Sequence, residues 1–233
     1  MAALHADIDA PLSWPADATD RMNRMYRRQR HIYDGTRRYY LLGRDQLIAG
    51  LRADAGANVL EIGCGTGRNL VSAARHYPDA RFFGIDVSTE MLSSAAAAIT
   101  RHGLMNRIQI AHGDATEFDS QKMFGVAVFD HVLISYSLSM IPDWRRAVAT
   151  AASHLKPGGR LHIVDFGNQE RLPVFLRTAL LRWLALFEVT PRDDLERALR
   201  EIADASGASL GFERPFHGYA QYAVLTAPVP RPA

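Results

Sequence analysis

The sequence contains one cysteine, almost no lysine and no long apolar run. The single cysteine, Cys64, has no partner for an internal disulfide, and the mixed, acidic first ten residues do not resemble a signal peptide. No stretch reaches the roughly 18 uninterrupted apolar residues that a membrane-spanning helix needs. We therefore expect a cytoplasmic protein that can touch a membrane but does not cross one.

Arginine accounts for 25 of the 27 basic residues, and the other two are lysine. Eight arginines fall between Arg21 and Arg44, where Asp34 is the only acid, although the formal net charge of the whole chain is +2. Such a block is typical either of a solvated helix face or of a surface for anionic lipid head groups or phosphates. The length of 233 residues and the hydrophobic content of 48% suit one domain with an appendage.

Short apolar runs alternate with alanine-rich helical stretches from Asn58 onward. This alternation predicts an α/β fold of the doubly wound, Rossmann-like kind, with a parallel sheet covered by helices on both faces. The sequence LKPGGR predicts a helix stop and a turn before the fifth strand, and the last two runs predict a hairpin at the sheet edge. The predicted strands are 57–62, 81–86, 107–113, 129–135, 160–166, 208–215 and 219–227.

The segment before this alternation differs in composition. Residues 1–19 predict a loosely ordered lead-in, and residues 20–52 predict helices that break at Gly35 and Gly43. We therefore expect an N-terminal tail and helical lid over residues 1–52 and a larger domain over residues 53–233. Within the larger domain, a helical insertion is expected at about 168–205.

The stretch VLEIGCGTGRN, residues 59–69, packs three glycines into five positions directly after an apolar run. In a parallel sheet, a glycine-rich first turn lets a ligand approach the backbone at a helix N-terminus. Gly63, Gly65 and Gly67 follow a G-x-G-x-G spacing, whereas the dinucleotide fingerprint requires a third glycine where Arg68 stands. A pyrophosphate ligand, and with it a nicotinamide-dependent oxidoreductase, therefore fits poorly.

Three acidic residues accompany the glycines. Asp86 ends the second predicted strand about 20 residues after the loop, where a carboxylate can accept both hydroxyls of a ribose. Asp114 ends the third strand and is placed to accept a hydrogen bond from an exocyclic amine such as that of adenine, while Glu61 adds negative charge near the glycines. These residues predict a ligand with a ribose, a base and more positive than negative charge.

The motifs EIGCGTG, GIDVS with Met91 following, GDA and LKPGG resemble, as an ordered set over Asn58–Gly167, class I S-adenosylmethionine-dependent methyltransferases. The resemblance implies a seven-stranded sheet with an antiparallel last hairpin and S-adenosylmethionine as cofactor. It also implies that the glycines contact the methionyl part, Asp86 the ribose, Met91 the adenine ring, and Asp114 with Ala115 the adenine amine. The cofactor-binding set that we predict is Tyr33, Arg44, Glu61, Gly63, Gly65, Gly67, Asp86, Met91, Asp114, Ala115 and Ser135.

The methyl acceptor is harder to predict, because an in-line displacement needs alignment more than reactive side chains. The segment Tyr26–Asp45 carries Tyr33 and Tyr40 on one helix face with Arg37 between them. It is interpreted either as a lid over the cofactor, with Arg44 near the glycine loop, or as a packed amphipathic helix. In the first interpretation, Tyr40 and Arg37 contact the substrate.

Two further segments surround the predicted site. After the fourth strand, Tyr136 and Trp144 are interpreted either as an aromatic surround for a cationic amine or as core residues. Tyr136 is the predicted catalytic residue, with Asp165 and His131 as alternative proton acceptors and Trp144 as a substrate contact. The segment 171–189 predicts a helix that lies at a lipid surface, forms a wall for an acyl chain, or packs against the sheet or a second subunit.

The string YRRQRHIYDGTRRYYLLGRDQLI, followed by the cofactor motifs, is similar to the N-methyltransferases of bacterial betaine-lipid synthesis. This resemblance implies three successive methylations of diacylglycerylhomoserine to diacylglyceryl-N,N,N-trimethylhomoserine. Phosphatidylethanolamine N-methyltransferases share the tyrosine–aspartate lid and a later glycine–arginine pair, here Gly43 and Arg44, and stay an alternative. Carbon methylation of a membrane quinol is another.

The partners follow from the same interpretation. We expect a lipid substrate at an anionic membrane surface, peripheral association with the inner membrane, and neither a metal ion nor nucleic acid; a homo-oligomer stays open. A binding protein that contacts RNA or a partner through the arginine-rich segment is the alternative of a different class. It is less favoured because Asp86 and Asp114 are both present, and a protein without the cofactor has no physical reason to keep them together.

Overall fold

The computed structural model describes residues 41–186 and 189–230. Predictions for residues 1–40, including those for Tyr33, Arg37 and Tyr40, lie outside the described residues. The helices are α2 (Arg44–Gly50), α3 (Arg68–His76), α4 (Thr89–Arg101), α5 (Ser120–Phe124), α6 (Trp144–Ser153), α7 (Val174–Ala185), α8 (Leu195–Ser206) and α9 (Pro215–Gly218). The strands are β1 (Asn58–Ile62), β2 (Arg81–Asp86), β3 (Ile108–His112), β4 (Phe129–Ser135), β5 (Leu155–Phe166), β6 (Ser209–Glu213) and β7 (Ala220–Thr226).

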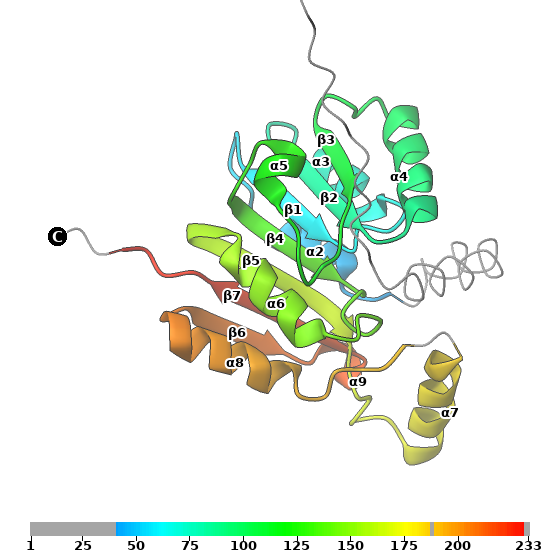
Figure 1. Ribbon diagram of the computed structural model, residues 1–233. Helices are drawn as coiled ribbons and strands as arrows, with labels where there is room; N and C mark the ends of the chain where they lie inside the picture. Colours follow the sequence, from blue (N-terminus) through cyan, green and yellow to red (C-terminus); the bar gives the residue numbers. More distant parts are fainter. Residues whose placement is uncertain (1–40, 187–188, 231–233) are drawn as a thin grey trace, which may run out of the picture.

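The described strands form one seven-stranded sheet in the order β3-β2-β1-β4-β5-β7-β6 (Figure 1). The pairings among β1 to β5 are parallel, whereas β7 runs antiparallel to both β5 and β6. The predicted fold, including the antiparallel last hairpin, is confirmed, and the hairpin places β6 at one edge of the sheet. The strand order reverses between β1 and β4, and ligands of open α/β sheets bind at the carboxyl ends of strands at such a point.

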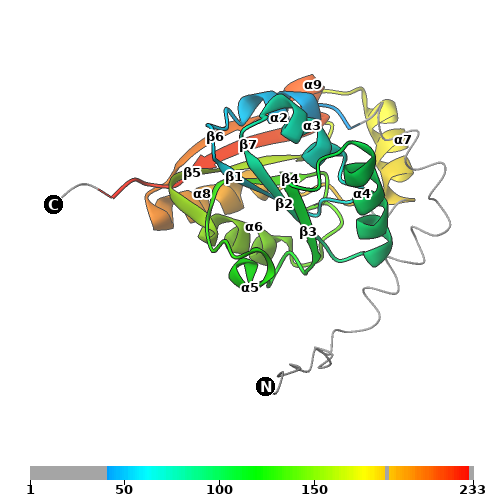
Figure 2. The same ribbon diagram turned by 90° about the horizontal axis from the view of Figure 1, so that it is seen from above.

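Helices cover both faces of the sheet. Figure 2 shows α2 and α3 on one face and α5 and α6 on the other. Neighbouring residues of a strand alternate between two apolar clusters: Val59 packs with the side of α2 and α3, and Leu60 with the side of α6 and α8. Because β4 is buried on both faces, its residues 132–134 form a continuous apolar run, VLI, and not an alternation.

The segment Leu155–Arg160 corrects one prediction. Helix α6 ends at Ser153, and LKPGGR forms the first half of the long strand β5, not a turn before it. The pairing of β5 with β4 shifts register between Phe129 and His131. Gly158 has a left-handed backbone with φ of 76°, so the turn residues produce a bulge inside the strand.

Two helices that lie in the predicted lid and insertion contribute to the core. Helix α2 buries Leu47 and Ile48 on one side of the sheet, although its sequence falls in the predicted lid. Helix α8 buries Leu195 and Leu199 on the other side, although its sequence falls mostly in the predicted insertion. The core therefore begins before residue 53, and it includes the end of the segment 168–205.

Helix α7 is the part of the insertion that stands off from the sheet (Figures 1 and 2). Leu184 is its one fully buried side chain, and Leu180, Leu181 and Trp183 pack partly against the core. Phe187, which falls in the predicted helical segment 171–189, lies outside the described residues. In the described part of the chain, no helix has the length and apolar character needed to cross a membrane.

Candidate cofactor and acceptor site

The glycine loop joins the carboxyl end of β1 to the start of α3. Gly63, Gly65 and Gly67 have left-handed backbones, with φ of 70°, 53° and 73°. A Cβ atom on Gly63 would lie 2.7 Å from the Cβ of Ser137, and one on Gly67 would lie 3.1 Å from the Cβ of Ala95, so packing requires these two glycines. Among the described residues, no atom lies within 4 Å of a Cβ atom on Gly65. Gly65 is therefore the position where open space reaches the backbone.

Asp86 is held beside this loop by backbone amides. Its Oδ2 accepts a hydrogen bond from Gly65 N at 2.7 Å, and its Oδ1 accepts one from Ser88 N at 2.9 Å. Ser88 also caps α4, since its Oγ accepts from Met91 N at 3.3 Å, and Met91 is buried in the first turn. The end of β2, the glycine loop and the start of α4 are thus one hydrogen-bonded unit. Contacts of Asp86 with a ribose and of Met91 with adenine stay predictions.

Glu61 is a buried carboxyl group below the loop. Its Oε1 accepts a hydrogen bond from Asn69 Nδ2 at 2.7 Å, while Oε2 is buried and has no hydrogen-bond partner among the described residues. Burial, with a smaller contribution from the charge of Asp86, raises the pKa of Glu61 to about 8 despite the lowering effects of Asn69 and Arg44. Sequence reasoning did not single out Asn69, although its place directly after the glycines was a usable signal.

Arg44 interacts electrostatically with two residues of the site, Glu61 beside the glycine loop and Tyr136 after β4. Gly43, with φ of 84°, precedes α2, and Arg44 is the buried first residue of that helix. Its positive charge lowers the pKa of both Glu61 and the Tyr136 hydroxyl. The structure thus places Arg44 close to the glycine-loop acid, as predicted, whereas its contact with a cofactor stays a prediction.

The turn after β3 carries the residues predicted to contact the adenine amine. Oδ1 of Asp114 accepts hydrogen bonds from the backbone N and the Oγ1 of Thr116, at 2.6 and 2.7 Å. Gly113 N donates to the backbone oxygen of Asp86 at 3.1 Å, which ties this turn to the end of β2. Asp114 and Ala115 are therefore on the same edge of the sheet as the glycine loop, and both are half-buried.

Tyr136 begins the loop after β4 with a left-handed backbone, φ of 55°. Its hydroxyl donates to the backbone oxygen of Leu42 at 2.5 Å, and its ring packs edge-on against Phe166 with centroids 4.7 Å apart. Burial raises the pKa of the hydroxyl, and Asp165 adds to this effect, so the hydroxyl stays protonated at neutral pH. A protonated hydroxyl is a poor proton acceptor, and Tyr136 is better suited to positioning. Ser135 is buried beside it, and its predicted cofactor contact stays a prediction.

The structure separates side chains that the sequence analysis grouped near the acceptor. Tyr136 packs in the apolar cluster on the side of α2 and α3, whereas Trp144 packs in the cluster on the opposite face, so the two rings do not form one aromatic surround. His131 pairs in register with Val59 and lies four residues before the carboxyl end of β4 at Ser135, which is about 13 Å along a strand. His131 is therefore too far from the loops of the site to accept a proton there.

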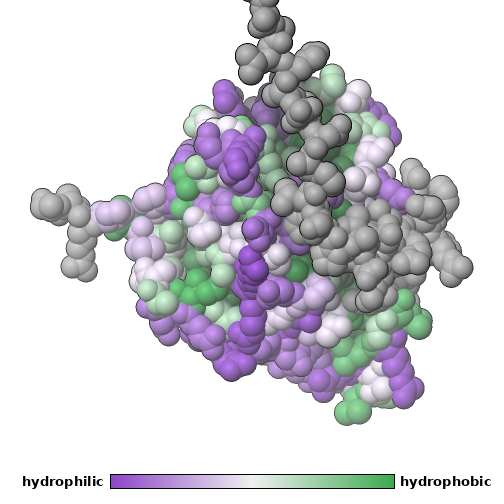
Figure 3. Space-filling model, in the orientation of Figure 1, coloured by the Kyte–Doolittle hydropathy of each residue, from purple (hydrophilic) through white to green (hydrophobic). Residues whose placement is uncertain are grey.

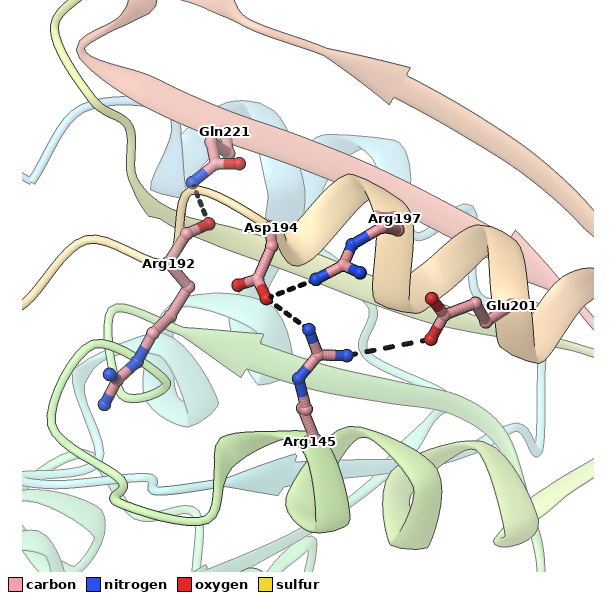
Figure 4. Close-up of polar contacts among 6 residues, drawn as sticks. All are labelled: Arg145, Arg192, Asp194, Arg197, Glu201 and Gln221. Atoms are coloured by element: carbon pink, nitrogen blue, oxygen red, sulfur yellow. Dashed lines mark hydrogen bonds and ion pairs between the residues drawn. The ribbon is translucent and has the colours of Figure 1, made fainter.

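Arg192 fixes the acceptor loop, residues 135–141. Its Nε donates to the backbone oxygen of Leu138 at 3.0 Å, and its Nη2 donates to that of Ile141 at 2.7 Å. Gln221 in β7 donates in turn to the backbone oxygen of Arg192 at 3.0 Å (Figure 4). Sequence reasoning missed both residues, because their partners are distant along the chain and no local motif marks them.

Asp165 is the buried acid next to this loop. Its Oδ2 accepts a hydrogen bond from Ser139 N at 3.2 Å and its Oδ1 accepts one from Phe166 N at 2.7 Å. Burial raises the pKa of Asp165 to about 6, although these hydrogen bonds lower it. Of the alternative proton acceptors that we predicted, Asp165 is the one that lies at the carboxyl edge of the sheet.

Comparison with known proteins identifies the central region. A family model described as a methyltransferase domain matches residues 59–159. The O-methyltransferase cnsE of Penicillium expansum is 32% identical over 148 residues, which cover 63% of this chain and 51% of that protein. A demethylmenaquinone methyltransferase of Listeria monocytogenes is 32% identical over 124 residues, 53% of this chain and 50% of that protein. The chain thus spans about half the length of these curated relatives.

A solved structure shows the same fold. Phosphoethanolamine N-methyltransferase 2 of Haemonchus contortus, in complex with S-adenosyl-L-methionine, superposes with a TM-score of 0.63 at 18% identity over 81% of this chain and 52% of that protein. The residues here fit that cofactor, because open space at Gly65 admits a ligand and the unpartnered Oε2 of Glu61 suits a cationic group. Residues 59–159 are thus similar to a methyltransferase domain, the sheet has the topology of the class I methyltransferase fold, and the cofactor that this fold and these residues support is S-adenosylmethionine.

Proposed function

We propose that the protein methylates the amine of diacylglycerylhomoserine in three successive steps, yielding diacylglyceryl-N,N,N-trimethylhomoserine at the inner membrane. The observation that carries methyl transfer is the open position at Gly65, beside the buried carboxyl groups of Asp86 and Glu61. The choice of acceptor rests on the resemblance of Tyr26–Ile48 to betaine-lipid N-methyltransferases. It is supported by the apolar, acid-free helix α7 that follows the carboxyl end of β5.

When bound, the cofactor supplies a methyl group on a positively charged sulfur, which leaves as a neutral thioether. The chain's own residues provide alignment and electrostatic matching. Asp86, held by two backbone N–H groups, presents acceptor oxygens for the ribose, and Glu61 presents a carboxyl oxygen for the amino group. Gly65 lets the ligand approach the backbone, so that the reacting methyl group is fixed relative to the acceptor loop.

Each methyl transfer also requires the acceptor amine to lose a proton, because only its lone pair attacks carbon. The hydroxyl of Tyr136 is already donated to Leu42 and is poorly acidic, so its proposed role is to hold the loop. Asp165, with a pKa of about 6 beside the acceptor loop, is the candidate proton acceptor, with solvent as the alternative. We propose that Arg37 binds the homoserine carboxylate and that Tyr40 contributes an aromatic contact to the ammonium, whereas Trp144 belongs to the core.

A second candidate is carbon methylation of a membrane quinol. It is favoured by one observation, the 32% identity to a demethylmenaquinone methyltransferase over 53% of this chain. Such an enzyme also needs an apolar acceptor region, so α7 is compatible with both functions. The two differ in the acceptor atom and in the number of methyl groups transferred.

The test offers three acceptors separately in mixed detergent micelles, with S-adenosylmethionine that carries a deuterated methyl group. We expect mass spectrometry to find one, two and then three labelled methyl groups on diacylglycerylhomoserine, and none on phosphatidylethanolamine or a demethylated quinol. One labelled methyl on the quinol ring would establish the second candidate. Labelling of phosphatidylethanolamine alone, or of no acceptor, would overturn the proposal.

Matched carboxylate variants show whether turnover depends on the site. Asp86→Asn removes the proposed ribose acceptor, and we expect turnover to fall at least about 100-fold. Asp130→Asn is the control, because Asp130 also accepts hydrogen bonds from a backbone amide, that of Asn58, and from Lys156, both at 2.8 Å, but near the amino end of β4. Turnover of the control should stay within about twofold.

A further inference from the structure

Helix α7 exposes an unusual amount of apolar surface. Val174 is 79% exposed, Phe175 and Leu186 are each 73% exposed, and Leu176 is exposed as well. In Figure 3, apolar side chains gather at the lower right, over the helix that Figure 1 labels α7. A surface helix normally hides its apolar side chains on one face, whereas those of α7 point both toward the core and away from it.

The charges on this helix have one sign. Arg171, Arg177 and Arg182 are its ionisable residues between positions 171 and 186, and the segment contains no acid. Arg171 and Arg182 are exposed, while Nε of Arg177 donates to the backbone oxygen of Asn168 at 2.8 Å. Large apolar side chains interleaved with arginine, without acids, complement a surface that is apolar inside and negatively charged outside.

The position of α7 relates this surface to the site. Leu180 and Leu184 on its inner side pack in the same apolar cluster as Tyr136. The chain enters α7 from the carboxyl end of β5, where Asp165 lies beside the acceptor loop. A membrane that covers the outer side of α7 would therefore lie next to the place where the acceptor must enter.

We propose that the outer surface of α7, formed by Val174, Phe175, Leu176 and Leu186 with Arg171 and Arg182, docks onto an anionic lipid bilayer. The helix lies in the interface and does not cross the bilayer. This inference rests on the proposed function, in which the acceptor is a lipid, and it names the surface that brings the site to that lipid.

The test is co-sedimentation of the full chain with sucrose-loaded phosphatidylcholine vesicles, with or without about 30% phosphatidylglycerol. We expect binding to the anionic vesicles that falls at least about tenfold in Val174→Ser/Phe175→Ser, because apolar area no longer enters the interface. Arg171→Gln/Arg182→Gln should weaken the same binding about tenfold and have little effect on neutral vesicles. Affinity for S-adenosylhomocysteine should not change in either variant, which shows that both are folded.

The matched control is Met105→Ser, which removes another exposed apolar side chain, 60% exposed, from the loop before β3. It should bind vesicles like the wild type. Equal losses in the control and the α7 variants, or no vesicle binding at all, would overturn the proposal. A dimer in analytical ultracentrifugation that Val174→Ser/Phe175→Ser dissociates, with unchanged vesicle binding, would assign the surface to a second copy and also overturn it.

The two proposals fail separately. Methylation of diacylglycerylhomoserine is measured in detergent micelles, where docking onto a bilayer is not needed. Vesicle binding without methylation would therefore overturn the proposed acceptor and support the proposed docking surface. Methylation in micelles without vesicle binding would overturn the surface and leave the acceptor.

Discussion

The glycine-loop half and the acceptor half of the sheet edge are held by hydrogen bonds of different range. On the first half, the partners are close in sequence: Glu61 and Asn69 are 8 residues apart, and Gly65 and Asp86 are 21 apart. On the second half, Tyr136 reaches Leu42 across 94 residues. The contact of Arg192 with Leu138 spans 54 residues, and that of Gln221 with Phe166 spans 55.

This difference separates recognition of the cofactor from recognition of the acceptor. The glycine-loop half is one βαβ unit, so a short motif fixes both its fold and its ligand contacts. The acceptor half is assembled from β4, β5, β7 and the segment between α7 and α8, so it can change by substitution in any of them. Experiments that affect one half without the other would sharpen the comparison.

The largest difference is expected between alanine substitutions at two glycines of the same loop, one of which should affect ligand affinity and the other folding stability. Gly65→Ala puts a methyl group into open space and costs only about 1 to 2 kcal/mol of stability, from the left-handed backbone. In the proposed site, the same methyl takes the space where the ligand approaches the backbone, so affinity for S-adenosylhomocysteine should fall at least about 100-fold in calorimetry. Gly63→Ala instead meets Ser137 at 2.7 Å and should lower the free energy of unfolding by roughly 2 to 4 kcal/mol in urea.

Gly56→Ala provides the control for backbone strain. Gly56 also has a left-handed backbone, φ of 79°, and no atom of residues 41–186 or 189–230 lies within 4 Å of an added Cβ, but Gly56 lies before β1 at the other end of the strand. It should lose about as much stability as Gly65→Ala and retain ligand affinity. Equal affinities of Gly65→Ala and Gly56→Ala would show that the ligand does not approach Gly65.

The same contrast decides what the sequence could predict. The parallel strands, the last hairpin and the place of the glycine loop and Asp86 at the ends of their strands follow from local patterns, and the structure confirms them. The predicted turn at LKPGGR was wrong, because these residues form a bulge in β5. The bulge depends on the pairing with β4, and the local sequence does not show that pairing. Tyr136 and Trp144 could not be separated in advance, since residues eight positions apart can lie on either face of a sheet.

A smaller effect is expected from pH on the glycine-loop half. In the ligand-free protein, the pKa of Glu61 is about 8, so its carboxyl group is mostly protonated below that pH. A cationic ligand amine favours the ionised carboxylate, so binding releases a proton and affinity rises as pH rises toward 8. Affinity for S-adenosylhomocysteine should increase about tenfold from pH 6 to 7.5, below the range near 7.7 to 8 where a free α-amino group titrates.

Two glutamate variants test this assignment. Glu61→Gln should flatten the dependence, because the group that loses the proton is gone. Glu117→Gln should keep the wild-type slope, since Glu117 is an exposed carboxylate paired with Arg146 at 2.9 Å. A slope that persists in Glu61→Gln would assign the proton to another group and remove Glu61 from the proposed amino-group contact.

The smallest effect, and the one confined to the acceptor half, is expected from Arg192→Lys. Lysine keeps the charge but lacks the planar fork that donates to both Leu138 and Ile141, so the acceptor loop loses a fixed position while the glycine loop is untouched. We expect kcat/KM for the lipid to fall about three- to tenfold and affinity for S-adenosylhomocysteine to stay within about twofold. Arg197→Lys is the control, because this exposed arginine pairs with Asp194 one turn away on α8 (Figure 4) and should have no effect. If Arg192→Lys weakened cofactor binding as much as turnover, the two halves would be energetically coupled, and the acceptor loop would belong to the cofactor site.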